Sequence, residues 1–517
     1  MGRESEHELS HHHHTHRKSA IVPRIATPSG AGSKIGGGVK SNGGASCSEA
    51  LIEDDDDKAF TAAAIAAALQ PMANPDTRSV DGYKRVPTLR ARRANLPPRL
   101  TNKPNPPPLR HLPIWYALPS LDAFRRVRTD VGDACLPAHK PFDFAPMRPG
   151  RIATYKYETQ SAYYTQYAQS LYAITGGKAG LDCMRHYEIL GSGAVPFFVD
   201  SAALDQSPLS MYAFPRELVQ RAARLPGVPS EAAVSHALKT DGALSINHSA
   251  FDRRAYCEIR AKLLAHTETY LTTTNLASYV LEQMRLARPS AFGIDPRSSL
   301  GASSSQRVKY SFGAGGSSAQ QPRVLIVSSK GVSGDTWQNA FLYHGLVSIL
   351  GHRVSSWLGR KEVLYHDFVY PHRFCCYGRG YSYARTLPTP LVYKKCKSKE
   401  VADALLRDQL RRRLDSGYFN LILVTTQSNK CCGVARCYGE DVKTLLNAYL
   451  RRNGNRTALA TIDGSDGYGG CNGQTFSGEL ERIDAHFLRE VDVKHAGRTA
   501  RLVQKPVTRV LGALSSS

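Results

Sequence analysis

Short and almost uninterrupted apolar runs recur along this chain, separated by segments of helix length. FNLILVTT (residues 419–426) is the clearest of them, and PRVLIVSS (322–329) and ALATID (458–463) are similar. Strands that are buried on both faces have this composition, and they occur in parallel sheets that helices cover. The pattern therefore predicts an α/β fold built on parallel sheets.

Changes in composition divide the chain into segments. Residues 1–108 contain HHHHTH, a Gly/Ser stretch, DDDDK and an Arg/Pro-rich stretch, which cannot build a core and predict a disordered basic arm. HHHHTH and DDDDK also resemble an affinity tag and an enterokinase site, and they carry no fold prediction. We expect a first Rossmann-like domain over 109–288, a Gly/Ser-rich linker over 289–322, a second Rossmann-like domain over 323–494 and a basic tail over 495–517.

The charge of the chain is strongly basic. Lys and Arg number 67 against 44 Asp and Glu, a formal net charge of +23. Such a field attracts polyanions, so a nucleic-acid or polyanion-binding protein that uses the basic arm is one candidate function. Zinc-finger spacing, an RNP-type aromatic motif and a helix-turn-helix signature are all missing from the sequence, and a basic arm alone binds phosphate without specificity.

Cysteine usage and apolar runs bear on the compartment. Eleven cysteines without a CxxC motif favour reduced structural thiols over a disulfide framework or a zinc site. No secretory signal or spanning helix is visible in the sequence, which favours a cytosolic protein; the ER or Golgi stays open if the natural N-terminus differs. The sequons at Asn247 and Asn455 carry no weight without evidence of secretion.

The stretch GGKAGLDCMRHYEILGSGAVPFFVD (176–200) reads as a Gly-rich loop, a helix over 181–190, a tight turn and a strand. The preceding YAIT also reads as a strand, which completes a βαβ unit. Arg185 and Glu188 are three residues apart and so share a helix face. They form either a surface ion pair or a ligand site. Asp182 is expected to stabilise the helix start.

RHYEILGSGAVPFF, from Arg185 to Phe198, resembles the nucleotide-sugar motif of exostosin-like glycosyltransferases. Arg185, Glu188, Gly193 and Pro196 occupy the places of that motif. The longer GLDCMRHYEIL also resembles glycosyltransferase-like proteins of algae, protists and large DNA viruses. The resemblance covers part of the first domain, and the second only loosely, through TIDGSD and HFLRE. It implies a GT-B-like fold of two Rossmann-like domains. Because the donor-like motif comes first, the domain order would be permuted.

The resemblance also implies roles for residues of the donor site. Glu188 would accept hydrogen bonds from ribose hydroxyls, and Arg185 would bind the diphosphate, with Lys178, His186 and Gly193 also at the donor site. Arg, Lys and the helix dipole can do the work of a metal ion, so no metal is expected. The stereochemical course stays open, because Gly180 stands where retaining enzymes often carry another Glu.

The second domain offers candidates for catalysis and for the acceptor. Asp463 and Asp466 follow a strand, where either could be the general base of an inverting reaction, or both could form an ordinary turn. On the acceptor side we expect His366, Asp367, Tyr381 and Arg385. His344 is expected to be a polar neighbour of the core.

The sequence thus predicts a glycosyltransferase (EC 2.4) that transfers a sugar from a UDP- or GDP-sugar to a glycan or protein acceptor. It would need no cofactor beyond the nucleotide sugar and would have no transmembrane segment. The alternatives are the polyanion-binding protein and a glycan-binding pseudoenzyme with the fold but without turnover.

Overall fold

The computed structural model describes residues 110–132, 135, 139–154, 157, 159–177, 180–206, 210–294, 322–328, 337–357, 362–369, 384–396, 398–425, 434–464 and 479–489. All of these residues belong to one compact unit, Ser46–Ser517. The expected basic arm, most of the expected linker and the expected basic tail lie outside the described residues.

The larger sheet has six parallel strands in the order β1-β9-β8-β7-β5-β6. Its strands are β1 (Arg110–Pro113), β5 (Val324–Val327), β6 (Val354–Ser356), β7 (Leu421–Thr425), β8 (Ala458–Asp463) and β9 (Ala485–Leu488). β6 lies on one side of β5, and β7, β8 and β9 follow on the other, which is the order of a doubly wound sheet. The three apolar runs are β5, β7 and β8, and all their residues are buried. The predicted parallel α/β class is therefore confirmed.

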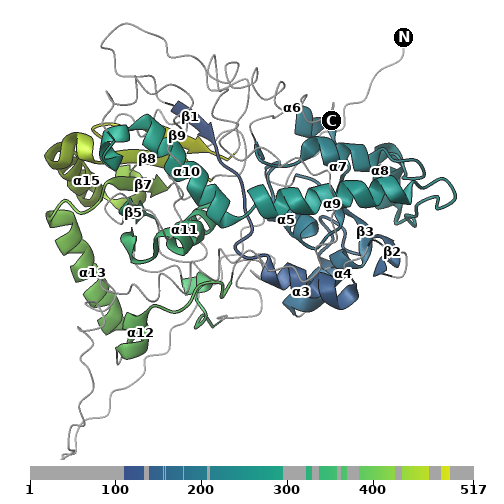
Figure 1. Ribbon diagram of the computed structural model, residues 1–517, viewed down its shortest axis with the longest axis horizontal. Helices are drawn as coiled ribbons and strands as arrows, with labels where there is room; N and C mark the ends of the chain where they lie inside the picture. The colour runs from purple at the N-terminus through teal and green to yellow at the C-terminus, as the bar shows by residue number, and fades with distance from the viewer. Residues whose placement is uncertain are drawn as a thin grey trace, which may run out of the picture. The chain divides into compact units, whose positions relative to one another are not determined.

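The smaller sheet has three parallel strands, β2 (Phe142–Phe144), β3 (Ser170–Thr175) and β4 (Val195–Phe198), with β3 in the centre. Helix α5 (Met184–Gly191) connects β3 to β4, so the predicted βαβ unit is present. Helices α4 (Gln160–Ala168), α7 (Arg216–Ala223) and α9 (Arg253–Tyr270) pack around it (Figure 1).

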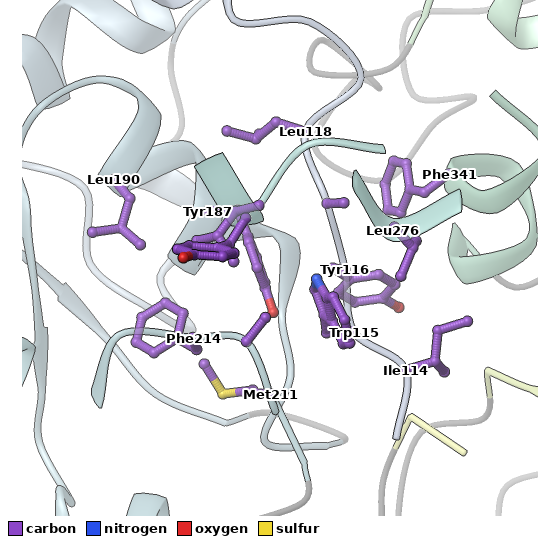
Figure 2. Close-up of a cluster of buried hydrophobic side chains, with 14 of the residues drawn as sticks. Ile114, Trp115, Tyr116, Leu118, Tyr187, Leu190, Met211, Phe214, Leu276 and Phe341 are labelled. Atoms are coloured by element: carbon purple, nitrogen blue, oxygen red, sulfur yellow. The ribbon is translucent and has the colours of Figure 1, made fainter. Parts of the chain in front are cut away.

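The chain passes between the two sheets at two neighbouring places. After β1 it runs through residues 114–118, and it returns through 271–273, where Leu118 and Thr272 form a parallel bridge. Figure 2 shows the first passage between Tyr187 and Phe214 on one side and Leu276 and Phe341 on the other. Helix α10 (Thr273–Ala287) then packs against β8. The chain thus returns to the larger sheet at residues 271–273, before residue 288, where the sequence placed the end of the first domain.

The structure describes further helices besides those already named. Helices α9 and α10 are separated at Leu271–Thr272, where Thr272 caps α10 by accepting a hydrogen bond from Asn275 N–H. The other helices are α3 (Asp122–Val131), α6 (Ala202–Gln206), α8 (Glu231–Thr240), α11 (Trp337–Leu350), α12 (Leu391–Lys395), α13 (Lys399–Asp415), α14 (Val434–Tyr438) and α15 (Glu440–Asn453).

Cysteine pairing differs from the expectation of reduced thiols. Cys135 and Cys257 form a disulfide, which joins the segment after α3 to α9. Cys396 and Cys437 are also disulfide-bonded, whereas Cys183 is free. The sequence could not show this, because Cys135 and Cys257 are 122 residues apart and their proximity depends on the fold.

Helices α10 and α11 touch through their backbones at Gly345. A Cβ atom built there would lie 2.0 Å from the Thr273 carbonyl oxygen and 3.0 Å from Ala277 Cβ. Beside this contact, the Thr273 hydroxyl lies 2.8 Å from Nδ1 of the buried His344. His344 is therefore a buried polar neighbour of the core, as expected, and Gly345 sets how closely the two helices approach.

Replacing Gly345 by Ala tests the close approach of α10 and α11, because the sign of the change in unfolding free energy depends on whether the methyl group has room. Gly→Ala inside a helix normally stabilises by up to about 1 kcal/mol. Here we expect a loss of about 1–3 kcal/mol in the free energy of unfolding, because the methyl group has no room. Urea unfolding measures it, with Gly176→Ala as control, since its Cβ would meet nothing closer than 3.7 Å. A stabilised Gly345→Ala variant would contradict the packing.

Candidate functional site

The β3–α5–β4 unit positions the two residues of the motif. Arg185 and Glu188 lie one turn apart on α5, which begins at Met184, three residues later than the sequence suggests. The preceding Gly176 and Gly177 follow the buried carboxyl end of β3. In open α/β sheets, ligands bind at this edge. The unit therefore places α5 where a ligand site is expected.

Glu188 is buried against the tyrosines of α4. Tyr163 OH donates a hydrogen bond to Glu188 Oε2 (3.0 Å), and the hydroxyls of Tyr163 and Tyr167 lie 3.3 Å apart. Burial first, and then the charge of Glu188, raise the pKa of Tyr163 well above its ordinary value, while Arg185 opposes this. Tyr163 thus keeps its proton and holds the Glu188 carboxylate in place. The positive charge of Arg185 lies near enough to act on the Tyr163 hydroxyl.

His186 is fully buried, and both of its ring nitrogens are in hydrogen bonds. Nε2 lies 2.9 Å from the Leu181 carbonyl oxygen, which can only accept, so Nδ1 is the acceptor of the Thr175 hydroxyl at 2.8 Å. Burial lowers the pKa of His186 to about 3, so the ring is neutral. His186 is therefore a core residue between β3 and the start of α5. To contact a nucleotide sugar, as the sequence suggested, its ring would have to break both hydrogen bonds.

Asp182 has a different role from the expected stabilisation of the helix start. The N-cap residue of α5 is Cys183, whose side chain makes no capping bond. The Asp182 carboxylate instead accepts hydrogen bonds from Tyr116 N–H (2.9 Å) and Tyr187 OH (2.8 Å). Burial raises the pKa of Asp182, and the charge of Arg489 is the first of the effects that oppose it. Asp182 therefore joins α5 to the passage after β1.

Gly193 forms the turn between α5 and β4, at the opposite end of α5 from the Gly-rich loop. Its φ is +78°, and a Cβ there would lie 2.8 Å from Arg260 Nη2. Lys140 Nζ (2.7 Å) and Arg260 Nε (2.9 Å) donate to its carbonyl oxygen, and Arg128 donates to that of Gly191. These buried cations lie at the negative end of the helix dipole, so the turn is built for a structural purpose.

The carboxyl end of β8 meets the loop before α5 through Arg489, which directly follows β9. Arg489 Nη1 donates to the Asp182 carbonyl oxygen (2.6 Å) and Nε to that of Gly464 (3.1 Å), while Arg489 N–H donates to the Asp463 carbonyl oxygen (3.0 Å). The buried Asp463 is thus brought to the neighbourhood of α5. Sequence reasoning missed Arg489, although it lies in the HFLRE pattern. Asp466 lies outside the described residues.

Polar groups also lie at the switch point of the larger sheet, beside β5. The first turn of α11 holds Gln338, whose Nε2 donates to the Trp115 carbonyl oxygen (2.9 Å). The buried Gln338 Oε1 and Ser328 Oγ have no hydrogen-bond partner among the residues that the structure describes. Neither residue was predicted from the sequence, because nothing in its local pattern distinguishes it from a core polar residue.

The expected acceptor residues are only partly described. His366 and Asp367 are exposed, and Asp367 accepts a hydrogen bond from the Thr389 hydroxyl (2.9 Å). Arg385 Nε donates to the Phe368 carbonyl oxygen (2.8 Å), so the three residues lie in one local cluster. Lys178 and Tyr381 lie outside the described residues.

Metal-binding clusters, membrane-spanning helices and similarity to known proteins each bear on the function of this chain. Among the residues that the structure describes, no group of three or more His, Cys, Asp or Glu could hold a metal ion, and no helix is long and apolar enough to cross a membrane. Comparison with protein-family models, with curated proteins and with solved structures finds no match for this chain.

The buried neutral His186 predicts a specific loss of stability in acid. Above pH 6.5 the folded and unfolded states are both neutral at this residue. As the pH falls from 6.5 towards 3, only the unfolded state takes up the proton, so the free energy of unfolding should fall by roughly 1 kcal/mol per pH unit. The similarly buried His344, with a pKa of about 4, adds to the slope.

Urea unfolding across that pH window should show a flatter dependence for His186→Gln than for the parent. His236→Gln is the control, because His236 is an exposed histidine on α8. Parallel curves for the parent and His186→Gln would mean that His186 is not held neutral by the fold.

Proposed function

We propose that the protein is a metal-independent glycosyltransferase that binds a UDP- or GDP-sugar at α5. The observation that carries the proposal is the buried contact of Arg489 with Asp182, since it joins the carboxyl ends of β8 and β9 to the loop before α5. A transferase needs donor and acceptor groups at one place, and this contact brings the motif helix and Asp463 towards each other.

In this proposal the motif residues bind the donor. The Arg185 guanidinium holds the diphosphate and offsets the charge that develops on the leaving nucleotide when the bond from sugar C1 to the phosphate oxygen breaks. Glu188 accepts hydrogen bonds from the ribose hydroxyls, and the bond from Tyr163 orients it. His186 supports α5 from the core. The likeness to the exostosin motif and this geometry both support these roles.

Asp463 is the general base in the same proposal. It is the last residue of β8, and its carboxyl group could take the proton from an acceptor hydroxyl, which corresponds to an inverting reaction. A general base must reach that proton within hydrogen-bond distance, directly or through one water molecule. This role therefore requires the acceptor to enter at the joined carboxyl ends of the two sheets.

Binding of the donor can be tested by thermal shift of the full chain against UDP-, GDP- and CMP-sugars. At 100 times the dissociation constant, a ligand stabilises the folded state by about 2.7 kcal/mol. We expect one nucleotide class to raise the melting temperature of the parent, and Glu188→Gln and Arg185→Met to lose most of this shift.

The matched control is Glu258→Gln, on the exposed side of α9, which should keep the full shift. A flat panel with folded parent protein would refute the donor site and leave polyanion binding by the basic arm as the leading function. A shift without sugar transfer to any acceptor would indicate the glycan-binding pseudoenzyme.

A further inference from the structure

Asn247 lies in an exposed turn between α8 and α9, in the sequon Asn247-His248-Ser249. Its backbone is fixed, because its N–H donates to the Gly227 carbonyl oxygen (2.8 Å) and its carbonyl oxygen accepts from Ala250 N–H (3.1 Å). All three sequon residues are exposed. The turn thus presents an acceptor motif to solvent on a well-anchored loop.

The side chains of the sequon are arranged around Asn247 Oδ1. The Ser249 hydroxyl (2.6 Å) and Ser249 N–H (3.2 Å) both donate to this oxygen, which forms an Asx turn. The amide nitrogen Nδ2 donates no hydrogen bond to any residue that the structure describes. A glycan on this nitrogen would therefore cost the described part of the fold no hydrogen bond.

The disulfides supply an independent observation about the compartment. Cys135 and Cys257 are joined, and Cys257 lies on α9, the helix that follows the Asn247 turn. Cys396 and Cys437 are bonded as well. Disulfides form and persist in oxidising compartments such as the ER lumen, which is also where sequons are glycosylated. These disulfides supply the evidence of an oxidising compartment that the sequence alone did not give for the two sequons.

The second sequon, Asn455-Arg456-Thr457, differs in its surroundings. Asn455 Oδ1 accepts a hydrogen bond from Arg288, and the Asn455 carbonyl oxygen accepts one from the Ser290 hydroxyl (3.0 Å). The Thr457 side chain is fully buried and donates to the Phe419 carbonyl oxygen (3.1 Å). Because Thr457 is buried and Asn455 is bonded to Arg288 and Ser290, the folded chain does not present this sequon freely, and the site serves as the internal comparison.

We propose that Asn247 is N-glycosylated and that Asn455 is not. The co-substrate is an oligosaccharide linked to a lipid diphosphate. The bond between sugar C1 and the diphosphate oxygen breaks, C1 forms a new bond to Asn247 Nδ2, the amide loses one proton to a base of the transferring enzyme, and the lipid diphosphate leaves. This modification is independent of the activity proposed for the protein.

Mass spectrometry of peptides from the full chain, produced in cells of its own source, tests the proposal. We expect the peptide that contains Asn247 to carry hexose and N-acetylhexosamine, and peptides that contain Asn455 to be unmodified. Asn247→Gln and Ser249→Ala should lose the glycan, whereas Ser249→Thr, which preserves the sequon, and Asn455→Gln should retain it.

A non-reducing peptide map of the same sample reads the Cys135–Cys257 bond independently. Joined cysteines with an unmodified Asn247 would overturn the glycosylation while leaving the compartment argument intact. Loss of the glycan in Asn455→Gln but not in Asn247→Gln would overturn the choice of site. Free cysteines and an unmodified Asn247 would overturn both.

Discussion

A single buried cation, the guanidinium of Arg489, determines how the two sheets meet. A guanidinium taken out of water costs several kcal/mol unless charge and hydrogen bonds compensate for it. Arg489 obtains them from the carbonyl oxygens of Asp182 and Gly464, from the nearby Asp182 carboxylate, and from the ring of Tyr116, whose centroid lies 4.7 Å away. These partners come from three distant parts of the chain, so the cation is stable only when all three have assembled.

The two chain passages complete this arrangement. Tyr116 belongs to the first passage, and its N–H donates to Asp182, so the backbone that leaves β1 is fixed to the loop before α5. The second passage lies beside the first and leads directly into α10, which contacts α11 backbone to backbone at Gly345. Apolar burial around Trp115 and Phe341 supplies non-directional stabilisation (Figure 2), whereas the Asp182 hydrogen bonds fix the register.

Local sequence pattern predicted those elements whose character depends on their own residues. β7 and β8 are buried on both faces and are therefore apolar throughout, and the β3–α5–β4 unit has a Gly-rich loop and a Gly turn as boundaries. Features that depend on distant partners could not be predicted. Examples are the pairing of β1 with β9, the disulfide of Cys135, and the cations that Arg128 and Lys140 bring to the end of α5. For the candidate site, the pattern singled out Arg185 and Glu188, and it could not show the burial of His186 or the hydrogen bonds that Asp182 accepts from Tyr116 and Tyr187.

The most direct test of this account is a double-mutant cycle between Asp182→Asn and Arg489→Gln, measured by urea unfolding of the full chain. If the Asp182 carboxylate compensates the buried Arg489 guanidinium where the loop before α5 meets the ends of β8 and β9, each single variant should be destabilised. The double variant should then be less destabilised than the sum, with a coupling energy of about 1–3 kcal/mol. Effects that add to within about 0.5 kcal/mol would show that the two side chains act independently, and would contradict the claim that the Asp182 carboxylate compensates the buried Arg489 charge.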